Sequence, residues 1–168
     1  RDYIMNPLQG HYHTLSIEKG LKLGDENALD FTRIDLSLNQ FIKTFEKQTI
    51  AIRLMAGQMT GDIETAEKYF IGGPNSVRGY REYPNSFAYG SHRLIANLEY
   101  RYILNPTFTV LGFIDWGWAT SLGSDLSKGK VGRGVGIRIT SPLGPIRIDF
   151  GFDEENEVRT HFNIGHVF

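Results

Sequence analysis

The sequence predicts an all-β protein, an antiparallel transmembrane β-barrel with eight strands in this chain. Apolar and polar residues alternate with a period of two in eight segments, which suit the ~9–11 residues that a tilted strand needs to cross a bilayer. Short and long connections alternate between these segments, as in outer-membrane barrels. Aromatic residues gather toward segment ends, where membrane interfaces would lie: Tyr12, Tyr100, Tyr102, Trp116, Trp118, Phe152 and Phe168.

Eight segments are expected to form the strands. In chain order they are 12–19, 33–39, 50–54, 93–102, 107–118, 134–139, 146–153 and 161–168. The first is the weakest, with Leu15 and Ile17 opposite Ser16 and Glu18. One face of the predicted sheet is apolar, and the other holds charges of both signs: Arg33, Asp35, Arg53, Arg93, Glu99, Arg101, Asp115, Arg138, Arg147 and Asp149. In a soluble barrel the charged face would meet water, whereas in a membrane barrel it lines the lumen.

The connections favour the membrane barrel. Short ones are expected near 44–48, 105–106 and 141–144, and longer ones near 20–27, 60–89, 121–130 and 153–158. Barrels of outer membranes have tight turns on the periplasmic side and long loops outside. An even strand count then places both chain ends on the side of the short turns.

Composition excludes several classes of protein. The net charge of −1 argues against nucleic acid as the main partner, and no apolar run approaches the ~18 residues of a membrane helix. The absence of cysteine excludes disulfides and thiolate metal sites. The chain opens on Arg1, which indicates either a removed leader or a start within a longer protein.

No catalytic or cofactor motif is evident, so we expect no enzyme, no cofactor and no metal. His11 and His13 share a strand face but have no third ligand. The glycines of 132–136 lack dinucleotide-loop spacing and precede no helix, and are expected to allow strand bending or close approach of a loop.

The longest connection contains the motif Gly72-Gly73-Pro74-Asn75-Ser76-Val77-Arg78-Gly79-Tyr80. Two glycines before a proline require unusual backbone angles, and Gly79 lets the chain present Arg78 at a tight tip. Composition alone favours an exposed turn whose arginine meets water.

This motif resembles the VRGY/VRGF loop of the BamA/TpsB superfamily, the outer-membrane barrels that assemble proteins into that membrane or secrete them across it. Five further segments resemble motifs of that family, in the family's order. They are Arg1-Asp2 with Asn6-Pro7 and Gly10, then Asn97–Arg101, Phe113–Gly117, Ser141–Arg147 and Phe162–Phe168. The resemblance covers essentially the whole chain.

The resemblance implies a loop that folds back into the lumen, with Arg78 paired to Asp115 and Glu99. Alternation alone already places both acids on the charged face. The loop motif would comprise Gly72, Gly73, Val77, Arg78, Gly79 and Tyr80, and the C-terminal assembly signal Phe162, Ile164 and Phe168. The resemblance further implies the bacterial outer membrane as the location, its lipid as the surroundings, and room for a periplasmic partner protein.

The chain also departs from that family, whose familiar members have sixteen strands preceded by POTRA domains. Here three predicted strands precede the loop and five follow it, which matches the second half of such a barrel. A closed eight-stranded barrel is filled by its own side chains and has no room for a loop of about thirty residues. The chain is therefore a segment of a longer protein, a short form that pairs as two halves, or a small barrel with the loop outside. We expect the paired form, a homodimer.

These arguments predict one domain over residues 1–168, an outer-membrane barrel that acts in insertion or translocation of proteins. Two alternatives remain open at this point. One is a passive membrane anchor for a partner domain, and the other is a soluble β-barrel that binds an apolar ligand.

Overall fold

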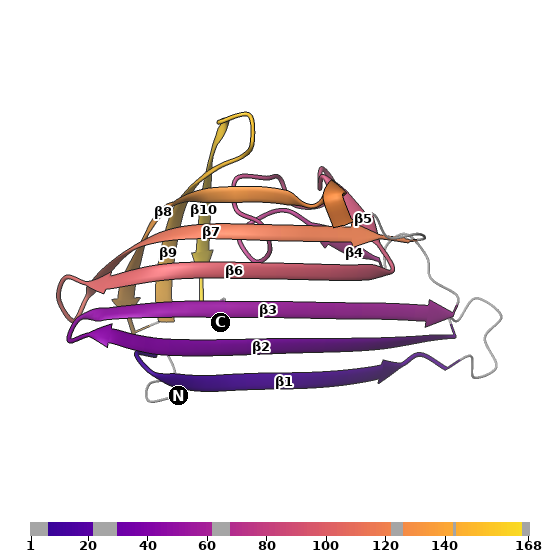
Figure 1. The fold of residues 1–168 in the computed structure, drawn as a ribbon, viewed down its shortest axis with the longest axis horizontal. Helices are drawn as coiled ribbons and strands as arrows, with labels where there is room; N and C mark the ends of the chain where they lie inside the picture. Colours follow the sequence, from indigo (N-terminus) through magenta and orange to yellow (C-terminus); the bar gives the residue numbers. More distant parts are fainter. Residues whose placement is uncertain (1–6, 22–29, 62–67, 122–125, 143, 166–168) are drawn as a thin grey trace.

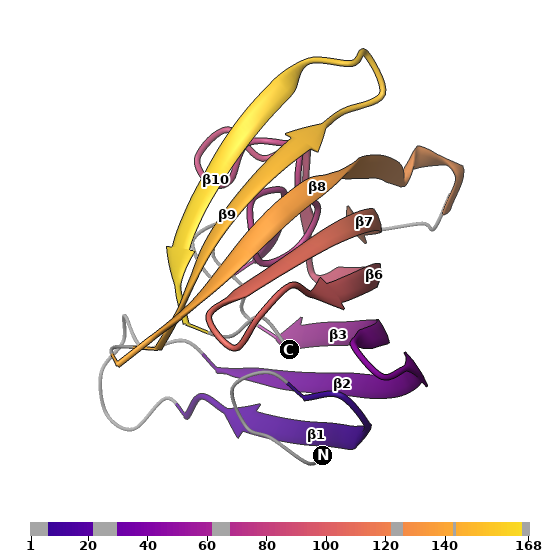
Figure 2. The ribbon, with the colours of Figure 1, turned by 90° about the vertical axis from the view of Figure 1, so that its left-hand side faces the viewer.

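The computed structural model describes residues 7–21, 30–61, 68–121, 126–142 and 144–165. Within these ranges the fold is all-β, with ten strands. Eight of them form one antiparallel sheet in the order β1-β2-β3-β6-β7-β8-β9-β10, and β4 and β5 form a separate hairpin. The large sheet curves strongly, and residues 68–91, which include β4 and β5, lie on its concave side (Figures 1 and 2).

The eight predicted strands make up the large sheet. The strands are β1 Gly10–Lys19, β2 Phe31–Phe45, β3 Gln48–Gly61, β4 Tyr69–Ile71, β5 Ala88–Gly90, β6 His92–Ile103, β7 Phe108–Thr120, β8 Lys130–Ser141, β9 Gly144–Phe152 and β10 Val158–Ile164. A single turn of 3-10 helix spans Leu126–Lys128. No helix among the described residues is long and apolar enough to cross a membrane.

Strand bounds and number differ from the prediction. β2, β3 and β8 are longer than the predicted 33–39, 50–54 and 134–139, and β10 covers Val158–Ile164 where 161–168 was predicted, with 166–168 outside the described residues. β3 extends to Gly61, beyond the point at which the alternation of apolar and polar residues stops, Leu54. The alternation stops there because the inward positions that follow Arg53 are apolar (Met55) or glycine (Gly57). The hairpin strands β4 and β5 were not predicted, since three residues are too few to show a period of two. The alternation of short and long connections agrees with the prediction.

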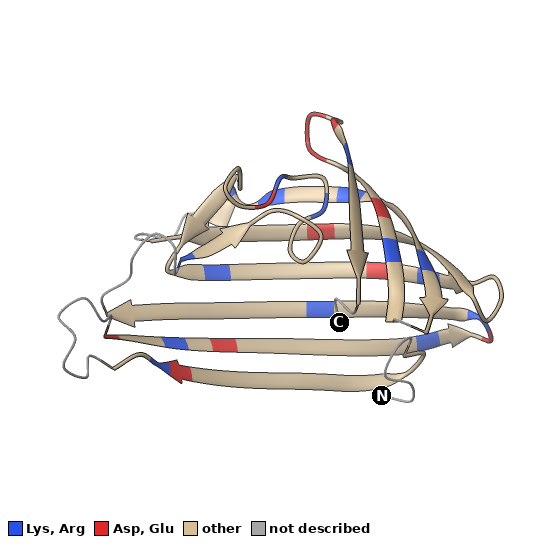
Figure 3. Ribbon diagram, turned by 180° about the vertical axis from the view of Figure 1, so that it is seen from behind, with Lys and Arg blue, Asp and Glu red and all other residues tan. Residues whose placement is uncertain are grey.

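The apolar and charged side chains are distributed over the two faces of the sheet in the opposite way to that of a water-soluble protein. Apolar side chains on the convex face are exposed, as at Leu15, Ile114 and Phe162, which are 66%, 55% and 64% accessible. Two carboxylates of the concave face, Glu99 and Asp115, are both 0% accessible. Figure 3 marks where the charged residues lie along the strands and in the loop. A sheet of this kind suits apolar surroundings outside and a polar interior.

The sheet is open in the described part of the chain. β1 pairs with β2 and β10 pairs with β9, and each has one unpaired edge. The predicted closed barrel is therefore not seen within these residues, which form a curved wall with the loop inside the curve. This placement of the loop differs from a small barrel that carries it outside.

Candidate functional site

The described residues between β3 and β6, 68–91, pack against the concave face as a loop. Its apolar residues Ile71, Val77 and Tyr80 make a buried cluster with Ile95 of β6. Partly buried neighbours complete this cluster: Met55, Phe87, Ala88 and Ala119. Inward-facing apolar residues such as Ile95 thus have a partner in the loop, which explains why they interrupt the polar face.

A cation–π contact joins the stem of the loop to an ion pair of the wall. Arg93 of β6 donates from Nη2 to Oδ1 of Asp35 at 2.7 Å, and its guanidinium lies 4.3 Å from the centre of the Tyr69 ring. Gly57 of β3 leaves room for that ring, since a Cβ there would lie 2.7 Å from Tyr69 Oη. Tyr69 therefore anchors the first part of the loop on the concave face.

Glycines on three adjacent strands allow the tip of the loop to touch the sheet backbone. A side chain at Gly117 of β7 would collide with Val77, and one at Gly132 of β8 with the carbonyl of Arg78. At Gly151 of β9 an added Cβ would lie 2.8 Å from the carbonyl carbon of Arg78. The close approach of a loop expected from the glycines of 132–136 is thus found at Gly132.

Arg78 lies at the centre of the site and is 2% exposed. Its Nε donates to Oδ2 of Asp115 at 2.8 Å and its Nη2 to Oδ1 at 2.9 Å, a two-pronged contact that lysine cannot reproduce. Its Nη1 donates to Oε1 of Glu99 at 2.5 Å. The guanidinium also lies 3.6 Å from the centre of the Phe113 ring. The structure therefore brings together the three residues that the loop motif and the alternation indicated.

A buried network extends this contact across the sheet. Asn97 Nδ2 donates to Oδ1 of Asp115 and to the carbonyl of Ser76, both at 2.7 Å. Arg53 Nε donates to Oδ1 of Asn97 at 3.0 Å, and its Nη2 to the carbonyl of Asn75 at 2.8 Å. Two carbonyls of the loop are thus bound by side chains of β3 and β6.

Further arginines of β6, β8 and β9 form ion pairs with Glu99 and with Asp149. Arg101 Nη2 lies 2.7 Å from Oε2 of Glu99. Arg138 bridges Glu99 at 3.1 Å and Asp149 at 2.6 Å, and Arg147 contacts Asp149 at 3.1 Å. We call the whole set the arginine–carboxylate cluster; its members are Arg53, Arg78, Arg101, Arg138, Arg147, Glu99, Asp115 and Asp149.

The charge of Arg78 is stable in this environment. Burial acts to lower the pKa of its guanidinium, but the carboxylates of Glu99 and Asp115 outweigh burial and raise that pKa above its ordinary value. Arg78 therefore stays cationic wherever the fold persists, and titration of this residue cannot release the loop.

The loop also reaches the last strand of the sheet. The backbone N–H of Gly79 donates to Nε2 of His161 at 3.2 Å, and Asn163 contacts Asn75 at 3.3 Å. Sequence reasoning placed His161 and Asn163 on the inward face but did not connect them to the loop. A link over 82 residues gives no local sequence signal.

The other predicted site residues have varied positions. Tyr80 Oη donates to the carbonyl of Val131 at 3.2 Å, Val77 is fully buried, and Gly72 and Gly73 have φ of 135° and 91°. Phe162 and Ile164 point outward and are exposed. Phe168 lies outside the described residues, as do Arg1, Asp2 and Asn6 of the opening motif. In the described ranges no three His, Asp or Glu side chains are grouped as metal ligands.

Arg78→Ala is expected to lower the free energy of unfolding by about 3–5 kcal/mol, because it leaves buried carboxylates without their central partner. Arg78→Lys should recover only part of this loss, since an ammonium group lacks the planar fork. The measurement is urea unfolding in detergent micelles followed by tryptophan fluorescence. The matched control is Arg81→Ala, which removes an exposed arginine of the same loop. Equal effects of the alanine variants at positions 78 and 81 would contradict a central role for Arg78.

Comparison with known proteins gives consistent results. Residues 1–168 match the Omp85 superfamily domain. The chain is 32% identical over 165 residues to Outer envelope protein 80, chloroplastic, of Oryza sativa subsp. japonica, covering 90% of this chain and 24% of that protein. It is 27% identical over 128 residues to Outer membrane protein assembly factor BamA of Nitratidesulfovibrio vulgaris, covering 64% of this chain and 16% of that protein.

A solved structure has the same fold. BamA from Haemophilus ducreyi lacking POTRA domains 1–3 superposes with a TM-score of 0.72 at 16% identity, over 98% of this chain and 38% of that chain. The chain therefore spans well under half of the length of each of these three proteins.

Proposed function

The chain belongs to the Omp85 superfamily, and from this we infer that it forms part of the wall of an outer-membrane barrel that inserts or translocates proteins. The convex face supports this proposal, because exposed side chains such as Leu15, Ile114 and Phe162 suit contact with lipid. The names of two relatives agree with it, one being an outer membrane protein assembly factor and the other a chloroplast outer envelope protein. The proposed location is an outer membrane, bacterial or of an organelle.

The observation that carries the proposal is the loop held inside the curved wall by the arginine–carboxylate cluster. Asp115 on β7 and Arg53 on β3 bind the loop through Arg78 and the carbonyl of Asn75, while His161 on β10 contacts its tip. A loop attached to these three strands senses the position of the terminal strand. We propose that this attachment couples the lumen to the edge at which client strands enter. The action is physical rather than enzymatic.

The open edges of the wall require further strands. In lipid each unpaired backbone group of an edge loses several kcal/mol, so β1 and β10 cannot remain exposed there. We propose that a second copy of the chain pairs with both edges by two-fold symmetry. Strands from the remainder of a longer chain would satisfy the same need. A periplasmic partner protein fits the same proposal.

A passive membrane anchor is the second candidate. The dense packing of the loop favours it, since Ile71 and Val77 are fully buried and Arg78 is 2% exposed. A static plug would need no more than this. The two candidates differ in whether the folded chain accelerates the assembly of another protein.

Liposomes that contain the folded chain should assemble a urea-denatured eight-stranded outer-membrane protein several-fold faster than empty liposomes. The readout is the gel shift of the heat-modifiable folded client over time. The control is liposomes with the same mass of an unrelated folded barrel. Equal rates in the two preparations would leave the anchor and contradict the insertion proposal. A chain that stays monodisperse without detergent would contradict both.

Cysteines introduced at Leu15 of β1 and Ile164 of β10 should form a disulfide between two copies, because β10 of one copy is proposed to pair with β1 of the next. Native mass spectrometry in detergent should then show a dimer. The double-cysteine chain carries no other cysteine, so crosslinks are unambiguous. A monomeric mass with the same disulfide formed within one chain would contradict the paired wall.

A further inference from the structure

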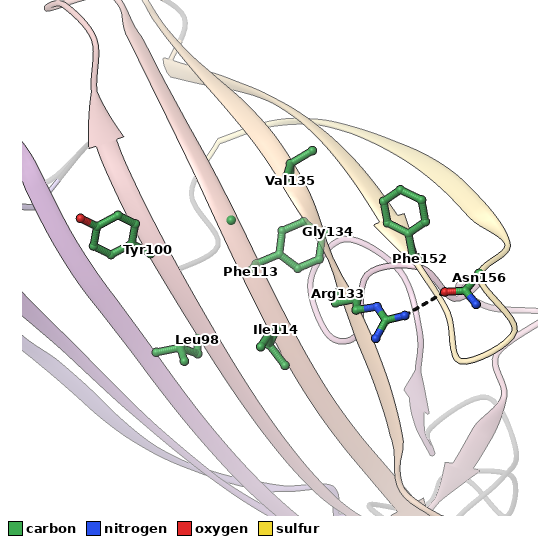
Figure 4. A pocket seen from close by; sticks show the side chains of 10 residues that line it. Leu98, Tyr100, Phe113, Ile114, Arg133, Gly134, Val135, Phe152 and Asn156 are labelled. Carbon is green, nitrogen blue, oxygen red and sulfur yellow. Dashed lines mark hydrogen bonds between the residues drawn. The ribbon is translucent and has the colours of Figure 1, made fainter.

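The convex face carries an apolar furrow along β7. Two adjoining hollows of about 650 Å³ and 390 Å³ form it, and Tyr100, Gly112 and Val135 line both. Figure 4 shows the larger hollow with Leu98, Tyr100 and Ile114 on one side and Val135 on the other. The furrow runs along the strands. Its lining residues come from outward positions of β6, β7 and β8 that pair side by side, one set of paired residues after another along the strands.

The furrow exists because Gly112 has no side chain. Gly112 takes an outward position of β7 between Val110 and Ile114. A Cβ added there would meet nothing closer than the carbonyl oxygen of Gly134, 3.9 Å away. The space above this glycine is therefore open and is bounded by apolar side chains. An extended hydrocarbon chain has the shape and polarity that fit such a furrow.

A cation stands at one end of the furrow. Register places Arg133 in one outward row with Leu98, Ile114 and Phe152. It donates from Nη2 to Oδ1 of Asn156 at 2.8 Å, and it is close to the end of β8 that leads toward the outer connections. An arginine at this place can extend its head toward the polar boundary of a membrane.

Arg133 differs from Lys19, the second charged residue on the convex face of the described strands, in its ion pairing. In the described strands, Lys19 and Arg133 are the outward-facing residues among Lys, Arg, Asp and Glu. Lys19 pairs with Asp30 at 2.5 Å, whereas none of the described ion pairs includes Arg133.

Three of the four acids in the neighbouring turn have bonds elsewhere, and none of the described ion pairs joins the fourth, the exposed Glu155, to Arg133. Glu154 accepts from the N–H of Val131 at 3.1 Å, and Glu157 pairs with Arg159 at 2.8 Å. Asp153 accepts N–H groups within its own turn. The Arg133 guanidinium, held by Asn156, therefore takes part in none of the described ion pairs with these acids.

We propose that the furrow and Arg133 form a binding site for a membrane lipid with a phosphate headgroup. One acyl chain lies over Gly112, and the phosphate accepts hydrogen bonds from the Arg133 guanidinium, which suits phosphate geometry. Asn156 positions that guanidinium through its side-chain oxygen. The site rests on the proposed function only in that the convex face must meet lipid, and it requires no insertion activity.

Native mass spectrometry of the full chain in dodecyl maltoside, titrated with phosphatidylglycerol, tests the site. The wild-type chain should retain one lipid at low lipid concentration. Arg133→Gln should weaken this binding about tenfold through loss of a charge-assisted contact, and Arg133→Lys should restore part of it. Gly112→Leu should also remove the bound lipid by filling the furrow, and the open space there lets this variant fold. Lys19→Gln, which changes the paired outward cation, is the matched control.

Each outcome separates the alternatives. Equal lipid retention by the wild-type chain, the glutamine variant at 133 and the leucine variant at 112 would overturn the site. Displacement of the lipid by millimolar glycerol phosphate would also overturn it, since binding would then depend on the phosphate without the acyl chain. A chain that retains lipid as expected but does not accelerate client assembly would contradict the proposed function and leave this site intact.

Discussion

The rest of the structure depends on the need to neutralise one buried guanidinium. Arg78 is removed from water by its own loop, so its charge requires carboxylates on the wall, and Asp115 and Glu99 supply them. These contacts draw the loop backbone onto β8 and β9, where only glycine leaves enough room at Gly132 and Gly151. The same contacts bury neighbouring arginines of the wall, which explains the density of the arginine–carboxylate cluster.

The two faces of the wall have separate tasks in this account. The concave face holds the loop by charge and hydrogen bonds, and the convex face offers apolar side chains to its surroundings, with Arg133, which enters none of the described ion pairs, at one end of the furrow. The loop contacts both an early strand, through Arg53, and the last strand, through His161. A change at either open edge would therefore reach the loop through a short chain of contacts.

A period of two was sufficient to predict the strands of the large sheet and their faces. The meeting of Arg78 with Asp115 was implied only by the resemblance of the loop motif to a known family, since composition alone favoured an exposed arginine. The hairpin of β4 and β5 was not predictable, because three-residue strands have no pattern. Inward apolar residues such as Ile95 and Phe113 were missed because they pack against the loop, which is distant from them in sequence. Gly112 gave no signal either, because the furrow results from a side chain that is absent.

The central claim is that Arg78 and Asp115 act as one unit that holds the loop on the wall. A double-mutant cycle of Arg78→Gln and Asp115→Asn, measured as free energies of unfolding in detergent, tests it most directly. The account predicts a coupling energy of about 2–3 kcal/mol between the two changes, at the upper end for residues in contact. Additive effects of the two substitutions, with a coupling energy near zero, would contradict it.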